Sequence, residues 1–125
     1  MEEKHWWQGY PWRMLQTNLR EIDMADIDAD AYAEQLKEYG ATVVTLNAAG
    51  IIASYQTQLD CQTQSPYLTG SSLNEIIDAC HKRGIRVIAR TDFSKLREGV
   101  FARHPDWAYR DKNGEVVNYN GNIQT

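Results

Sequence analysis

The chain has 125 residues, of which 42% are hydrophobic, enough for one domain with a buried core. Its net charge of −4 argues against a nucleic-acid partner, because proteins that bind phosphate backbones usually present a basic patch. No apolar run approaches the roughly 20 residues that span a bilayer, so we expect no membrane partner. The N-terminus lacks the apolar core of a signal peptide, and the two cysteines make no disulfide framework or metal pattern. We therefore expect a cytoplasmic protein that needs no metal or cofactor.

The N-terminal segment is unusually aromatic and follows neither the helical nor the strand period. Its aromatic side chains surround Gly9 and Pro11 and are Trp6, Trp7, Tyr10 and Trp12. We expect this segment to plug one end of a barrel or sheet. Residues 14–19 then form the first predicted strand, and Asn18 lies near its end.

An acidic stretch over residues 21–29 follows and raises the question of a calcium loop. Counted from Asp23, the sixth position of an EF-hand loop is Asp28 where a glycine is required. We therefore interpret the stretch as a loop that leads into a helix N-terminus, where the helix dipole favours acidic residues. Asp28 or Asp30 is expected to cap a helix over residues 30–39.

Two helix–glycine–strand units can be read along the chain. Gly40 ends the first helix and precedes a predicted buried strand over residues 42–47, which finishes at Asn47. In the second unit, Ser72 and Glu75 have capping-box spacing at the start of a helix over residues 72–83. Gly84 ends that helix, a strand over residues 85–91 follows, and Asp92 comes directly after it.

The alternation of strands and helices predicts a parallel sheet with right-handed crossovers. In such sheets, functional groups gather just past the carboxyl ends of the strands. Asn18, Asn47 and Asp92 would then meet at one rim, where amides and a carboxylate suit the hydroxyl groups of a ligand. The alternative is that the two asparagines make local turn hydrogen bonds and that Asp92 caps loop amides.

Two further segments carry candidate binding residues. The long loop over residues 48–70 is rich in amides and phenols, and Tyr55 could stack on a sugar. After the third strand come His104 and Trp107 in a His-Pro-Asp-Trp turn, and then Asn113-Gly114, a strong hairpin signal. His104 could contact substrate or could only hold its loop, and for both aromatic residues loop packing is the alternative.

The sequences Gly-Ile-Arg-Val-Ile-Ala-Arg-Thr-Asp-Phe-Ser-Lys and His-Pro-Asp-Trp-Ala-Tyr-Arg-Asp-Lys-Asn-Gly-Glu resemble a known pattern. They are similar to the N-terminal part of a bacterial family of hypothetical glycoside hydrolases with a TIM-barrel catalytic domain, related to α-L-fucosidase and β-galactosidase type barrels. The resemblance covers most of residues 12–122 and is most specific in the His-Pro-Asp-Trp and Asn-Gly pair.

The resemblance implies an α/β fold, a partial (β/α)8 TIM barrel with three parallel strands, crossover helices and a β-hairpin after the third strand. Residues 1–125 would be a single domain, the N-terminal portion of that barrel. The substrate would be a carbohydrate bound by Asn18, Asn47, Tyr55, Asp92, His104 and Trp107. The principal catalytic carboxylates would lie outside this chain, so we expect the chain alone to be inactive.

Two other interpretations remain open at this point. The chain could be a non-catalytic carbohydrate-binding or protein-interaction module, or an α/β domain whose activity does not involve sugars. A half-barrel also leaves sheet edges unpaired, so we expect homo-oligomers to form through those edges.

Overall fold

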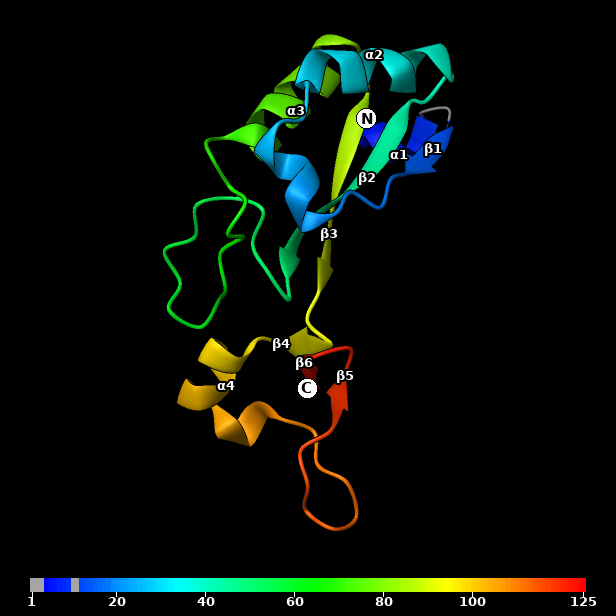
Figure 1. Cartoon of the computed structure of the whole chain (residues 1–125). Coiled ribbons are helices and arrows are strands. Elements are labelled where there is room, and N and C mark those ends of the chain that lie inside the picture. Colours follow the sequence, from blue (N-terminus) through cyan, green and yellow to red (C-terminus); the bar gives the residue numbers. More distant parts are fainter. Residues whose placement is uncertain (1–3, 10–11) are drawn as a thin grey trace.

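The computed structural model describes residues 4–9 and 12–125. A three-stranded parallel sheet forms its first part, with the strands in chain order β1 (Met14–Gln16), β2 (Val43–Gly50) and β3 (Arg86–Asp92). Helix α2 (Ala29–Glu38) connects β1 to β2, and helix α3 (Ser72–Lys82) connects β2 to β3 (Figure 1). The predicted order of strands and helices is therefore confirmed.

The largest differences from the sequence prediction concern β1, β2 and the acidic stretch; the other predicted helices and strands differ by one residue at one or both ends. β1 ends at Gln16, two residues before Asn18, and β2 continues past Asn47 to Gly50. The acidic stretch is not an open loop, because Glu21–Ala25 forms a 3-10 helix, η1. Asp23 stabilises its start by accepting a hydrogen bond from the backbone N–H of Arg20 at 2.6 Å.

The N-cap of α2 is one of the two residues predicted, and the N-cap of α3 was predicted wrongly. Asp28 caps α2, and its carboxylate accepts a hydrogen bond from the backbone N–H of Ala31 at 2.9 Å. The capping box at Ser72 was wrong, because Ser71 occupies the N-cap position and Ser72 is the first helical residue. The Ser72 hydroxyl donates instead to the carbonyl of Met24 at 2.8 Å, which ties α3 to η1.

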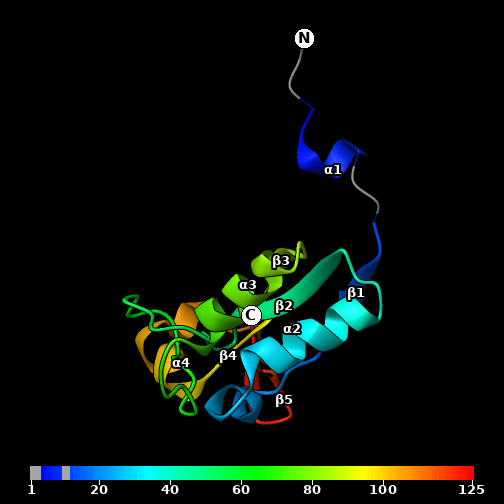
Figure 2. The ribbon, with the colours of Figure 1, turned by 90° about the horizontal axis from the view of Figure 1, so that it is seen from above.

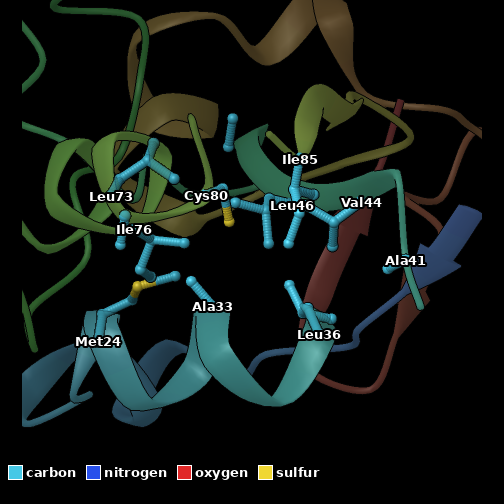
Figure 3. Packing of buried hydrophobic residues seen from close by; sticks show 12 residues of the cluster. Met24, Ala33, Leu36, Ala41, Val44, Leu46, Leu73, Ile76, Cys80 and Ile85 are labelled. Carbon is cyan, nitrogen blue, oxygen red and sulfur yellow. The ribbon is translucent and has the colours of Figure 1, made fainter. Parts of the chain in front are cut away.

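The main core lies between the sheet and the two helices. Val44 and Leu46 of β2 pack against Leu36 of α2 and against Ile76 and Cys80 of α3 (Figure 3). These side chains are at most 4% exposed. In α3, Leu73, Ile76 and Cys80 have helical spacing, which places one face of the helix in this core.

The C-terminal residues form a smaller unit beyond the ends of β2 and β3 (Figure 1). An antiparallel sheet has the order β4 (Lys95–Leu96), β6 (Asn122–Gln124), β5 (Asn118–Tyr119). It is accompanied by α4 (Glu98–Arg103) and a 3-10 helix, η2 (Pro105–Trp107), and we call residues 93–125 the C-terminal unit. Its own apolar cluster contains Leu96, Val100 and Ile123.

Two Asn-Gly turns shape the C-terminal unit. The predicted turn at Gly114, with φ of 84°, lies between the bridged residues Arg110 and Val116. The second turn, Asn120-Gly121, was not predicted; both of its residues have positive φ, and they connect β5 to β6. Paired positive φ values favour glycine and asparagine, so the dipeptide itself was a usable signal.

The described part of the N-terminal segment includes helix α1 (Trp6–Gly9), which lies apart from α2 and α3 (Figure 2). The Arg86 guanidinium, at the start of β3, lies over the Trp6 ring at 5.4 Å from its centroid. The segment thus contacts the sheet at the end opposite the C-terminal unit, while Tyr10 and Pro11 lie outside the described residues. Within the described ranges, no helix has the length and apolar character needed to cross a membrane.

Candidate functional site

Side chains alternate between the two faces of the parallel sheet, and this alternation places the candidate residues. Val44 and Leu46 point toward the helices, so Asn47 points to the opposite face. Asn47 pairs with Arg90 across β2 and β3, which puts Arg90 on that same face, and Asp92 follows two residues later. These three side chains are thus brought together at the carboxyl ends of the two strands.

A pocket of about 620 Å³ opens at this place, and we call it the strand-end pocket. Leu19, Ile22, Ile51 and Ile52 supply part of its apolar lining. Its charged and amide side chains are Arg20, Glu21, Asn47, Arg90, Asp92, Arg97 and Asn122. The pocket is therefore mixed in character, with hydrogen-bonding groups placed next to apolar surface.

Asn47 is held in place by hydrogen bonds from both sides. Its carbonyl oxygen Oδ1 accepts a hydrogen bond from Arg90 Nη1 at 3.1 Å. Its amide Nδ2 donates to the backbone carbonyl of Leu19 at 3.4 Å, so the asparagine connects β3 to the segment after β1. A guanidinium carries five N–H donors, and among the described residues Arg90 makes only this one hydrogen bond and no ion pair.

Asp92 is ordered by the residue two positions later. Its oxygen Oδ1 accepts hydrogen bonds from the Ser94 hydroxyl at 2.6 Å and from the Ser94 backbone N–H at 3.0 Å. These two bonds hold the pKa of Asp92 below its ordinary value, with smaller contributions from Lys95 and Arg90. The carboxylate is therefore ionised at neutral pH and can accept hydrogen bonds from ligand hydroxyls through Oδ2.

The structure separates Asn18 from the other two strand-end residues. Asn18 is exposed beyond β1 and does not line the strand-end pocket, although its neighbours Leu19 and Arg20 do. Its Oδ1 accepts a hydrogen bond from Gln16 Nε2 at 3.0 Å. Asn47 and Asp92 thus share one pocket. Asn18 instead makes a local hydrogen bond, which was the alternative to ligand binding expected from the sequence.

A second pocket of about 690 Å³ adjoins the first and contains two of the predicted aromatic residues, Tyr55 and Trp107. We call it the aromatic pocket. Phe93, Leu59 and Cys61 also line it, and within the part of the chain that the structure describes Lys95 is the one lining residue with a charged side chain. Tyr55 donates a hydrogen bond from its hydroxyl to Gln62 Oε1 at 3.2 Å, which orients its ring.

His104 does not line the aromatic pocket, but it contacts Trp107, which does. Its ring stacks on the Trp107 indole, with the two centroids 4.0 Å apart and the planes at 10°. The backbone of His104 also closes η2, because its carbonyl accepts a hydrogen bond from the Trp107 N–H at 3.1 Å. The histidine therefore positions Trp107, which agrees better with a supporting role than with contact to a ligand.

Arg90 and Arg97 line the strand-end pocket but were not among the predicted site residues. Arg90 could have been found, because it precedes Asp92 by two positions and a strand places such residues on one face. Arg97 gave no comparable signal, since it reaches the pocket only through the packing of the C-terminal unit. There it forms an ion pair with Glu21 of η1, which is far away in the sequence.

A scan against protein-family models matches residues 28–125 to the family described as Hypothetical glycosyl hydrolase 6. The matched range includes Asn47, Asp92 and all of the C-terminal unit. A search of curated proteins found no match.

Two solved structures resemble this chain. The α-L-fucosidase isoenzyme 2 from Paenibacillus thiaminolyticus is 18% identical with a TM-score of 0.70, over 90% of this chain and 18% of the fucosidase chain. The β-galactosidase from the psychrophilic Marinomonas ef1 is 18% identical with a TM-score of 0.56, over 89% of this chain and 16% of that chain. The chain thus spans less than a fifth of the length of either, and at this identity the likeness shows the fold alone. The fold is part of a barrel of the kind these enzymes have.

Proposed function

The chain belongs to the family Hypothetical glycosyl hydrolase 6, and from this premise we propose that it forms part of the carbohydrate site of a glycoside hydrolase barrel. The observation that carries the proposal is the strand-end pocket, where Asn47, Arg90 and Asp92 converge. An amide, a guanidinium and a carboxylate together offer both donors and acceptors, as vicinal sugar hydroxyls require. The neighbouring isoleucines suit the apolar face of a sugar ring.

We propose further that the principal catalytic carboxylates of the whole enzyme lie outside this chain. Glycoside hydrolysis needs a carboxylic acid that keeps its proton at working pH, together with a second carboxylate. The two carboxylates that line the strand-end pocket do not fit the first role. Asp92 has a lowered pKa, and Glu21 is held in an ion pair with Arg97. Both support binding and orientation of a substrate better than proton donation.

Saturation-transfer NMR with methyl glycosides tests the binding proposal, and methyl α-L-fucoside and methyl β-D-galactoside are suitable first probes. We expect binding of at least one glycoside by the 125-residue chain. Asn47→Ala and Asp92→Asn should each weaken it about tenfold or more, because each change removes hydrogen bonds, and Asp92→Asn removes a charged acceptor.

Asn74→Ala and Asp106→Asn are matched controls, because both residues are exposed and lie outside the two pockets. The proposal would be contradicted if these controls weakened glycoside binding as much as the pocket variants, or if the pocket variants did not weaken it.

The same preparations should release no nitrophenol from 4-nitrophenyl glycosides. Turnover that Asp92→Asn abolishes would show instead that the chain carries its own catalytic group.

A further inference from the structure

The aromatic pocket differs from the strand-end pocket in chemistry although the two adjoin. Tyr55, Phe93 and Trp107 contribute three aromatic rings to its lining, and Leu59 adds an aliphatic side chain. Phe93 is 66% exposed, Leu59 59% and Trp107 45%, so large apolar surfaces face solvent around one hollow. Such surface favours a flat apolar ligand group over a hydroxyl-rich one.

The two pockets meet at the ends of β2 and β3. Ala49 lines both of them, and the consecutive residues Asp92 and Phe93 line one each. Gly50 stands at the same place and has no side chain to separate the pockets. A ligand whose polar part occupies the strand-end pocket can therefore extend a second group over Gly50 into the aromatic pocket.

From this arrangement, and resting on the proposed function, we propose that the aromatic pocket binds an aromatic aglycone attached to the sugar. The Trp107 ring is suited to such stacking because the His104 ring stacks on one of its faces and limits its rotation. The two ring centroids are 4.0 Å apart. Among the described residues, Lys95 is the one lining residue with a charged side chain, and its positive charge attracts a phenol oxygen or a nitro group.

Isothermal titration calorimetry of paired ligands tests the proposal. 4-Nitrophenyl α-L-fucoside is compared with methyl α-L-fucoside, and the two β-D-galactosides are compared in the same way. We expect the nitrophenyl compound of a pair to bind about tenfold more tightly than its methyl counterpart. Trp107→Ala and Phe93→Ala should each weaken binding of the nitrophenyl glycoside far more than binding of the methyl glycoside, and so remove most of this difference. Tyr109→Ala is the control, because Tyr109 is an exposed aromatic residue of the C-terminal unit outside both pockets.

Cys61 provides a second readout at the pocket itself. It is partly exposed there, whereas the other free cysteine, Cys80, is buried and has a thiol pKa that burial raises. Iodoacetamide should therefore modify Cys61 first. The nitrophenyl glycoside should slow that reaction at least severalfold, and the methyl glycoside should not.

The outcomes separate this inference from the proposed function. Equal affinities of the nitrophenyl and methyl glycosides, or an unprotected Cys61, would overturn the aglycone site while leaving the sugar site standing. Absence of binding by every methyl glycoside, with nitrophenyl compounds and free 4-nitrophenol bound alike, would overturn the proposed function and the aglycone assignment together.

Discussion

Gly50 packs directly against the backbone of Asp92 at the carboxyl ends of β2 and β3. A Cβ atom on Gly50 would lie 1.8 Å from the Asp92 carbonyl oxygen, and Gly50 has a φ of 125°. Both the contact and the positive φ require a residue without a side chain. The backbone position of Asp92 in the strand-end pocket therefore depends on the glycine opposite it.

We expect Gly50→Ala to destabilise the protein and to displace Asp92, because the methyl group and the Asp92 carbonyl cannot occupy the same space. Thermal unfolding followed by circular dichroism should show a lower Tm, and binding of methyl glycosides should fall. Gly70→Ala is the matched control, since a Cβ there meets no atom within 4 Å and should leave Tm nearly unchanged. An unchanged Tm for Gly50→Ala would contradict the close packing of the two strand ends.

Ile76 on α3 provides a test of the main core. Its side chain is 0% exposed in the cluster between the helices and the sheet. Ile76→Ala should lower the free energy of unfolding by about 2–5 kcal/mol, the range for a buried aliphatic side chain cut to alanine. Ile77→Ala changes the same residue type at the next position, where the side chain is only partly buried, and should lower the free energy of unfolding clearly less. Urea denaturation measures both, and equal losses would contradict the assigned helix face.

The hydrogen bonds from Ser94 predict the direction of pH dependence at Asp92. A carboxyl whose pKa is lower in the folded than in the unfolded protein adds stability above its unfolded pKa, and that contribution is lost as pH falls through the folded pKa. Ser94→Ala removes the hydroxyl bond and keeps the backbone one, so the Asp92 pKa should rise part of the way toward its ordinary value. NMR titration of the side-chain carboxyl measures this pKa. Ser71→Ala, a distant exposed serine, should leave it unchanged, and an unshifted pKa in Ser94→Ala would refute the assigned cause.

The edges of the parallel sheet predict self-association. Within the described residues β1 and β3 each pair only with β2, so both have one open edge. β3 carries Arg86 and Arg90, charges that discourage strand pairing, whereas β1 has none and exposes half of Met14. We expect concentration-dependent oligomers in light scattering that Met14→Lys reduces. Tyr39→Lys, at an exposed helix end, is the control, and a monomer at all concentrations would contradict the prediction.

Local sequence was sufficient to predict most of the elements and the rim on which they converge. Periodicity and glycine stops identified α2, α3 and the three parallel strands, because these signals depend on neighbours within one or two turns. Parallel strands also have carboxyl ends on one side, so Asn47 and Asp92 could be expected to approach each other without any coordinates. The start of α3 was missed by one residue, because Ser71 and Ser72 are equally good caps and the contact of Ser72 with Met24 is long-range.

The composition of the pockets was decided by tertiary structure. Arg97 reaches the strand-end pocket because the C-terminal unit folds back onto η1, and no local pattern encodes its pairing with Glu21. Likewise, Tyr55 and Trp107 come from two segments that meet only after the sheet and both loops are in place. Sequence by itself determined which strands end in polar groups, since that follows from hydrophobic periodicity and from the glycines that end the helices along the chain. Which of those groups share a cavity depends on contacts between distant residues, and only packing in three dimensions specifies them.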